Sequence, residues 1–81
     1  MAAIEVYSRA GCHLCEHLIE ALLPIVRGKL DVNVIDIDES EALVAEYGTR
    51  IPVVEYQGQF VCQYELDGDA IRQIVADNAR S

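Results

Sequence analysis

The sequence predicts an α/β domain with the element order βαβαββα, whose four-stranded mixed sheet has helices on both faces. Three observations support this prediction. Four short segments rich in alternating or β-branched apolar residues suit strands, and the last two are separated by a tight turn. Helical apolar spacing and capping residues mark the segments between them. At 81 residues, 52% hydrophobic and 25% charged, the chain is expected to form one domain over residues 1–81.

The first strand is expected at residues 3–7, and the first helix begins at about Cys12 or His13. The apolar side chains expected on the buried face of this helix recur at helical spacing: Leu14, Leu18, Ala21, Leu22 and Ile25. Pro24 lacks an N–H and its ring clashes with the preceding turn, so the helix should kink or end near it. Gly28 supplies a stop.

The second strand is predicted over residues 31–38, parallel to the first, because a right-handed helical crossover connects them. Asp38 and Glu41 have the spacing of a capping box, which predicts a short helix that ends at Gly48. The acidic residues here are interpreted as a solvated helix start, and no metal site is assigned to them.

A β-hairpin is predicted at residues 51–56 and 59–64, joined by Gln57 and Gly58 as a two-residue turn. A final helix is expected to begin near Asp67, whose side chain can cap it.

The chemically informative motif is the Cys12-x-x-Cys15 pair, which lies at the first strand-to-helix junction. The positive end of a helix favours an anion, so the pKa of the Cys12 thiol should lie below its ordinary value. Cys15, one turn further on, is close enough to form a disulfide with Cys12. We therefore expect Cys12 to be the attacking sulfur. His13 either stabilises its thiolate or is simply an exposed residue at the start of the helix.

Composition excludes several classes of function. The net charge is −8, with 14 acidic against 6 basic residues and no basic cluster, which argues against nucleic acid or an anionic membrane as partner. No apolar run approaches the roughly 18 residues of a membrane span, and the first residues do not resemble a signal peptide. We expect a cytoplasmic protein. Three cysteines, two of them close together, indicate a redox or metal role in a reducing compartment.

Residues 7–15, 50–54 and 57–58, taken with the element order, resemble the thioredoxin fold in the compact form found in glutaredoxins and small bacterial glutaredoxin-like proteins. The resemblance spans nearly the whole chain. It implies that Cys12 is the nucleophile, Cys15 the resolving thiol, and Pro52 a cis-proline that faces the disulfide. In that family the residue before the proline, here Ile51, offers its backbone to an extended thiol substrate.

The resemblance also implies a substrate surface. Arg9 stands where glutaredoxins often have a lysine that meets a glutathione carboxylate, and Arg50 replaces the usual threonine of the proline loop. The chain departs from the family in three places: His13-Leu14 replaces Pro-Tyr between the cysteines, Arg50-Ile51-Pro52 replaces Thr-Val-Pro, and Cys62-Gln63 and Glu65-Leu66 replace the Gly-Gly and acidic pair. The last change removes groups that help hold the γ-glutamyl end of glutathione.

The leading hypothesis is a monomeric thiol–disulfide oxidoreductase with a role in electron transport and cell redox homeostasis. Its substrates would be protein disulfides or glutathione mixed disulfides, and glutathione or a reductase would be the electron donor. No bound cofactor is expected. Glutathione enters only as a co-substrate.

The alternative is a metal-binding module. The pair supplies only two of the four ligands of a structural zinc site, so His17 or Cys62 would have to converge on it. A glutaredoxin-like iron–sulfur cluster shared by two subunits is a variant of this alternative. Cys62 is either a small buried hydrophobic residue or a third redox thiol.

Overall fold

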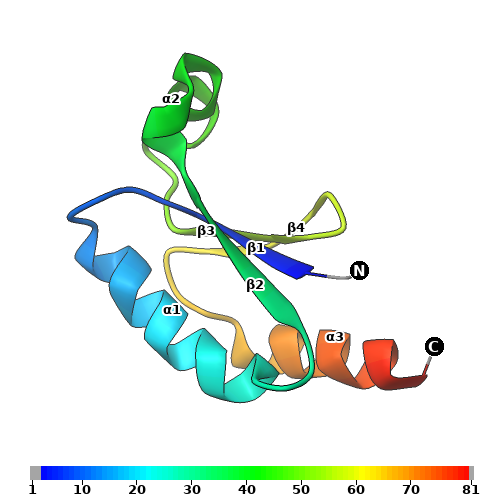
Figure 1. Cartoon of the computed structure of the whole chain (residues 1–81). Coiled ribbons are helices and arrows are strands. Elements are labelled where there is room, and N and C mark those ends of the chain that lie inside the picture. The colour runs from blue at the N-terminus through cyan, green and yellow to red at the C-terminus, as the bar shows by residue number, and fades with distance from the viewer. Residues whose placement is uncertain (1–2, 81) are drawn as a thin grey trace.

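A computed structural model describes residues 3–80; residues 1, 2 and 81, which the single-domain prediction includes, lie outside the described residues. The elements are β1 (Ala3–Ser8), α1 (His13–Val26), β2 (Asp31–Asp36), the 3₁₀ turn η1 (Ile37–Glu39), α2 (Glu41–Tyr47), β3 (Val53–Tyr56), β4 (Gln59–Gln63) and α3 (Gly68–Arg80). The predicted order βαβαββα is confirmed (Figure 1). Among the described residues, no helix is both long and apolar enough to traverse a lipid bilayer.

The four strands form one mixed sheet in the order β2-β1-β3-β4. β1 is parallel to β2 and antiparallel to β3, and β3 and β4 form the predicted hairpin. α1 and α3 contact each other and lie on one side of the sheet, whereas α2 lies beyond the other side, at one end (Figure 1). The predicted mixed sheet with helices on both faces is confirmed.

Two cores lie on opposite faces of the sheet because side chains alternate along each strand. The larger core faces α1 and α3, and its buried members are Ile4, Val6, Leu18, Leu22, Val26, Leu30, Val54, Cys62 and Ile71. The smaller core faces η1 and α2, and contains Ile37, Tyr47 and Val53, with Tyr7, Leu43, Val44 and Ile51 packed against it. The smaller core therefore lies under the segment that connects α2 to β3.

The buried face of α1 differs from the predicted one. Its buried residues are Cys15, Leu18, Leu22 and Val26. Leu14 is 54% exposed and Ala21 is also exposed, so both predictions were wrong. Apolar residues occupy more of this helix than one face can bury, and only packing against the sheet selects Cys15 in place of Leu14.

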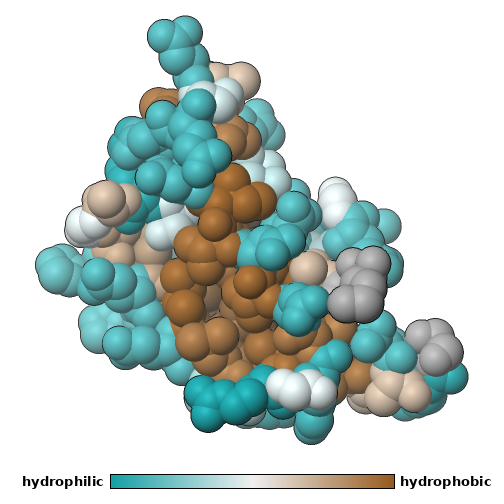
Figure 2. Space-filling model, in the orientation of Figure 1, coloured by the Kyte–Doolittle hydropathy of each residue, from teal (hydrophilic) through white to brown (hydrophobic). Residues whose placement is uncertain are grey.

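The layer between β2 and α1 is open at the edge of the sheet. β2 is an edge strand, and the apolar side chains Val34 and Leu23 are 53% and 39% exposed. Figure 2 shows a patch of apolar atoms on this face of the molecule, in the region of β2.

The helix boundaries follow the predicted signals. α1 includes Pro24 but continues only to Val26, and Gly28 takes a φ of 76°, a left-handed conformation that suits glycine. Only Ile25 and Val26 follow Pro24 in the helix, so α1 ends near the proline as predicted. At the start of α3, Asp67 caps the helix by accepting from the N–H of Ala70 at 3.1 Å, as predicted.

The segment after β2 was predicted incorrectly. The strand ends at Asp36, whose side chain accepts from the Asp38 N–H at 2.9 Å and turns the chain into η1. Ser40 caps α2 instead of Asp38, because its hydroxyl accepts from the Ala42 N–H at 3.2 Å. The carboxylate of Asp38 is instead hydrogen-bonded to Arg9.

The hairpin strands are shorter than predicted. β3 begins at Val53, directly after the proline, and β4 ends at Gln63. Gln57 and Gly58 form the predicted two-residue turn, with φ values of 53° and 78°. Two positive φ angles are characteristic of the type I′ turn.

Candidate active site

The loop from β1 to α1 places Cys12 at the N-cap of α1. Gly11 has a φ of 80°, and Cys12 returns to an extended conformation with φ −84° and ψ 103°. The Cys12 Sγ then accepts a hydrogen bond from the backbone N–H of Cys15 at 3.2 Å. A sulfur atom therefore occupies the place that a serine or aspartate oxygen takes at most helix starts.

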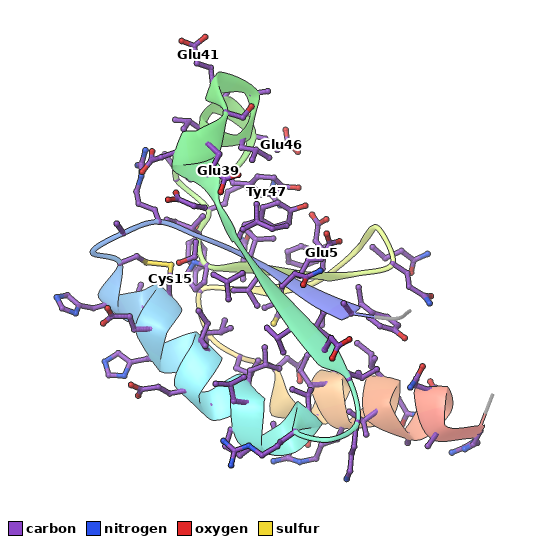
Figure 3. The ribbon with its side chains drawn as sticks, in the orientation of Figure 1. Glu5, Cys15, Glu39, Glu41, Glu46 and Tyr47 are labelled. Carbon is purple, nitrogen blue, oxygen red and sulfur yellow. A yellow bond between two sulfur atoms is a disulfide. The ribbon has the colours of Figure 1, made fainter. Side chains whose placement is uncertain are left out.

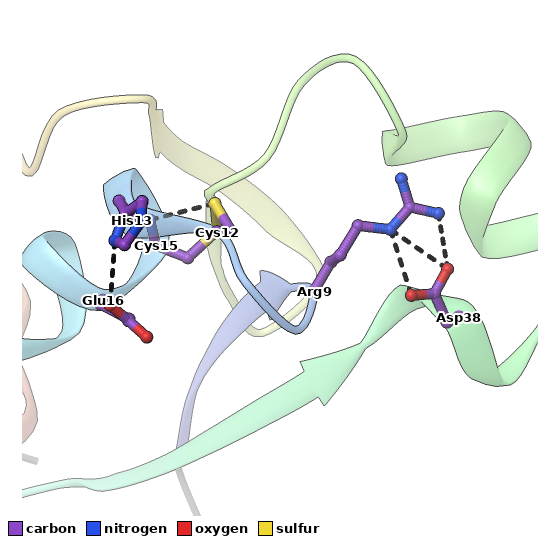
Figure 4. Close-up of a disulfide and its surroundings, with 6 residues drawn as sticks. All are labelled: Arg9, Cys12, His13, Cys15, Glu16 and Asp38. Carbon is purple, nitrogen blue, oxygen red and sulfur yellow. Dashed lines mark hydrogen bonds and ion pairs between the residues drawn. A yellow bond between two sulfur atoms is a disulfide. The ribbon is translucent and has the colours of Figure 1, made fainter.

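Cys12 and Cys15 form a disulfide, with their Cα atoms 5.2 Å apart (Figures 3 and 4). The predicted proximity of the two sulfurs is confirmed. The two residues differ in access, because Cys15 is fully buried whereas Cys12 is half-buried. An incoming group can therefore reach the sulfur at the cap more easily than the sulfur inside the helix.

His13 lies outside this arrangement. Its side chain is 88% exposed, and its Nδ1 lies 3.5 Å from the Glu16 carboxylate (Figure 4). An exposed pair of this kind contributes little energy. The contact favours the interpretation of His13 as an exposed helix-start residue. His17 is also exposed.

Arg9 anchors the loop that carries Cys12. Its Nε donates to both carboxylate oxygens of Asp38 at 3.1 Å, and its Nη2 donates to one of them (Figure 4). Hydrogen bonding within this pair raises the pKa of Arg9 and lowers that of Asp38. A substrate carboxylate that used Arg9 would have to share the guanidinium with Asp38, a partner that the sequence did not reveal.

The proline loop lies at the same end of the sheet as Cys12. Tyr7 pairs with Val53 in the antiparallel β1–β3 ladder, so Pro52 follows beside Ser8, where the loop to Cys12 begins. The Ile51–Pro52 peptide bond is cis, as the family resemblance implied. Figure 4 shows the segment between α2 and β3 passing close to Cys12.

Tyr64 holds this proline loop at two points. Its backbone N–H donates to the Pro52 carbonyl at 2.8 Å, and its hydroxyl donates to the Thr49 carbonyl at 3.0 Å. Tyr64 has a φ of 66°, which is uncommon for a residue with a side chain and is often found near functional sites. Sequence reasoning assigned Tyr64 no role, because neither contact leaves a local pattern.

Arg50 is held at the start of the same loop. Its guanidinium carbon lies 5.4 Å from the centre of the Tyr47 ring, a cation–π contact. Its Nε donates to the Gln63 side-chain oxygen at 3.4 Å, and its Nη1 lies 3.7 Å from the Glu46 carboxylate. The structure thus places Arg50 beside the proline loop but engages it with three neighbours.

An aromatic pair supports the loop from the smaller core. The rings of Tyr7 and Tyr47 stack with centres 4.0 Å apart, and the Tyr47 hydroxyl donates to Glu55 at 2.9 Å. Burial raises the pKa of both tyrosines. Both are therefore neutral packing residues at physiological pH.

The third cysteine lies apart from the pair. Cys62 pairs with Val54 in the sheet and is 8% exposed within the larger core. Burial raises the pKa of its thiol. Within residues 3–80, no three His, Cys, Asp or Glu side chains cluster so as to hold a metal ion, so His17 and Cys62 do not complete a site with the pair.

A small cleft of about 260 Å³ lies between α1 and the segment after β4. Its walls are mainly apolar and are formed by Leu14, His17, Leu18, Ala21, Tyr64, Glu65 and Leu66. Leu14 lies between the two cysteines in the chain, and Tyr64 is the residue that holds the proline loop. Neither cysteine lines the cleft, which reaches the dithiol segment only at Leu14.

The sheet order, the helices and the dithiol at the start of α1 define a protein of the thioredoxin-fold class. Within this class, the family model described as glutaredoxin-like domain (DUF836) matches residues 3–76, and the chain belongs to that family.

The chain is also similar to known proteins and solved structures. The chain is 34% identical to an uncharacterized protein of Mycobacterium tuberculosis, Rv0508, over 96% of this chain and 84% of the relative. The solution structure of protein Ne2328 from Nitrosomonas europaea is similar, with a TM-score of 0.78, 36% identity, and coverage of 90% of this chain and 89% of that one. A mutant thioredoxin from Halobacterium salinarum shares the fold, with a TM-score of 0.62, 24% identity, and coverage of 95% and 74%.

Proposed function

We propose that the protein is a thiol–disulfide oxidoreductase that cycles Cys12 and Cys15 between a dithiol and a disulfide. The observation that carries this proposal is the asymmetry of the pair. Cys12 is partly exposed at a helix N-terminus and its sulfur accepts an N–H hydrogen bond, whereas Cys15 is buried one turn behind it. These are the positions that a nucleophile and a resolving thiol require.

The cycle starts from the reduced protein. The Cys12 thiolate attacks one sulfur of a substrate disulfide; a Cys12–substrate disulfide forms, and the other substrate sulfur leaves as a thiolate. Cys15 then loses its proton and attacks Cys12 Sγ, which closes the intramolecular disulfide and expels the second substrate thiolate. Two electrons pass to the substrate, and the two released thiolates take up protons.

Local electrostatics favour the attacking form of Cys12. In the oxidised protein the Cys15 N–H already points at Cys12 Sγ, and the same donor can stabilise a thiolate there. The helix N-terminus adds a favourable field. Glu16 in the first turn opposes it.

The apolar cleft that begins at Leu14 favours protein disulfides as substrates. Leu14 and Tyr64 flank it and are 54% and 44% exposed, so an apolar side chain next to a substrate cysteine can be buried there. Glutathione has no such side chain. Arg9, the cation proposed to meet its carboxylate, is engaged by Asp38, and a net charge of −8 repels an anion.

One copy of the chain suffices for this cycle, in a reducing compartment such as the cytoplasm. A disulfide reductase or glutathione must return the electrons to the oxidised pair. Glutathione therefore enters the proposal as an electron donor rather than as the preferred substrate.

Equilibration in a glutathione redox buffer, followed by acid quenching and mass spectrometry, tests the proposal. We expect conversion between the dithiol and the Cys12–Cys15 disulfide, with a two-electron dependence on the buffer potential. In a Cys15→Ser variant the resolving step is lost, so the mixed disulfide at Cys12 should accumulate. A Cys15→Ser protein that forms no mixed disulfide with either glutathione or a peptide disulfide would contradict the assigned roles.

A further inference from the structure

A second, larger groove lies at the opposite end of α1 from the dithiol. It has a volume of about 820 Å³ and lies between the C-terminal part of α1 and α3. Its apolar lining includes Pro24, Ile25, Val75 and Ala79, and its basic lining residues are Lys29 and Arg72. Small residues keep it open, and a methyl group placed at Gly28 would meet no atom within 4 Å.

The basic residues of this acidic chain are concentrated around the groove. Of the 6 lysines and arginines, four lie on or next to its lining: Arg27, Lys29, Arg72 and Arg80. Arg9 and Arg50 are near the dithiol and are engaged by Asp38 and Glu46. Among the ion pairs of the described residues, Arg72 contacts Asp69 at 3.3 Å and none involves Arg27 or Lys29.

We propose that this groove binds an acidic amphipathic helix of a partner protein, with apolar side chains on its floor and carboxylates beside Lys29 and Arg72. The walls of the groove are mainly the C-terminal part of α1 and the outer face of α3, which offer no strand edge, so a partner would be recognised chiefly by its side chains. An amphipathic helix presents an apolar stripe with charges along its edges, which matches an apolar floor with a basic rim.

Lys29 and Arg72 on the groove favour an acidic partner although the protein as a whole is acidic. A protein with a net charge of −8 repels an acidic peptide at long range, so binding requires the local positive charge of the groove together with apolar burial. α1 has 14 residues and is therefore roughly 20 Å long, so a helix docked at its C-terminal end leaves Cys12 accessible. The inference does not depend on the redox proposal.

The test uses a soluble helical peptide with leucines on one face and glutamates along its edges, titrated into isotope-labelled oxidised protein at low salt. Amide shifts should appear at Lys29, Arg72 and Val75. Lys29→Gln should weaken binding by about threefold to tenfold. Gln59→Glu changes the net charge by the same −1 at an exposed position of β4 and is the matched control, which should change affinity less than twofold. Ala79→Glu, at an exposed position of α3 that lines the groove, should abolish measurable binding.

Circular dichroism melts show whether each variant is folded, so that a loss of peptide binding is not mistaken for a loss of structure. Three results of the peptide titrations would overturn the proposal. They are equal weakening by Lys29→Gln and Gln59→Glu, equal binding of a peptide with lysines in place of glutamates, and shifts confined to the cleft beside Leu14 and Tyr64. Binding of laurate at the groove without binding of the peptide would also overturn it, in favour of a lipid ligand.

Discussion

Cys12 and Cys62 are the same residue type in two contrasting regions of one small domain. Cys12 is half-buried at a helix N-cap, where its sulfur accepts a backbone N–H. Cys62 is 8% exposed in the larger core on β4, and burial raises its pKa. The difference shows that the place of a thiol in the fold, and not its chemistry alone, decides whether it can react.

The same contrast applies to the surroundings of each sulfur. Cys12 lies in the loop before α1, at the end of the sheet where the proline segment begins β3, and its side chain is half-buried. Cys62 is bordered by core side chains such as Val54 and Ile71. A reactive sulfur needs both stabilisation of its anion and a route for a second sulfur, and only Cys12 has both.

Replacement of Cys12 should have the largest effect on activity, and replacement of Cys62 should have almost none. Cys12→Ser should lower the rate of reduction of a peptide disulfide by more than about a thousandfold, because a hydroxyl cannot replace the thiolate nucleophile. Cys62→Ala is the control and should retain the rate within about twofold. The comparison fails if the two variants lose similar activity in a stopped-flow assay at equal protein concentration.

Alkylation of the reduced native protein should separate the two thiols by rate. We expect iodoacetamide to modify Cys12 at least tenfold faster than Cys62 at neutral pH, because Cys62 is buried and its pKa is raised. The rate at Cys12 should also rise at lower pH than that of a free thiol measured alongside. Peptide mapping by mass spectrometry gives both rates, and equal rates in folded protein would refute the distinction.

Substitutions at Cys62 should affect stability rather than chemistry. Cys62→Ala leaves a small cavity and should cost about 1 kcal/mol of unfolding free energy, whereas Cys62→Ser buries a hydroxyl and should cost roughly 1–3 kcal/mol. Urea unfolding of both variants measures the difference. If Cys62→Ser were more stable to urea than Cys62→Ala, the surroundings of Cys62 would be polar, and its environment would differ less from that of Cys12.

Tyr47→Phe should have the smallest effect on the free energy of unfolding. It extends the comparison of buried polar groups to the smaller core, on the opposite face of the sheet from Cys62. Loss of the hydroxyl donated to Glu55 should cost about 1 kcal/mol at neutral pH. The folded protein raises the pKa of Tyr47, so its contribution is complete below the tyrosine pKa of the unfolded chain and declines as pH rises above it. The difference between wild type and Tyr47→Phe should therefore shrink in urea unfolding at about pH 11. A difference that grew with pH would contradict the direction of the shift.

Several features were predictable because their signals are local. Gly28 after α1, the Gln57–Gly58 turn and the Asp67 cap each act within a few residues, and all three were predicted correctly. The Asp38 cap was wrong because Ser40 and Asp36 compete for nearby N–H groups, and a partner 29 residues away takes the Asp38 carboxylate.

The sequence by itself determined the order of the elements and the position of the dithiol at the start of α1, since periodicity, caps and Cys-x-x-Cys spacing are short-range properties. The tertiary structure alone decided which side chains surround that dithiol. Tyr64 reaches Thr49 across 15 residues, and Leu14 turns outward because Cys15 packs inward. Such contacts join distant segments through packing, and packing between distant segments leaves no periodic trace in the chain.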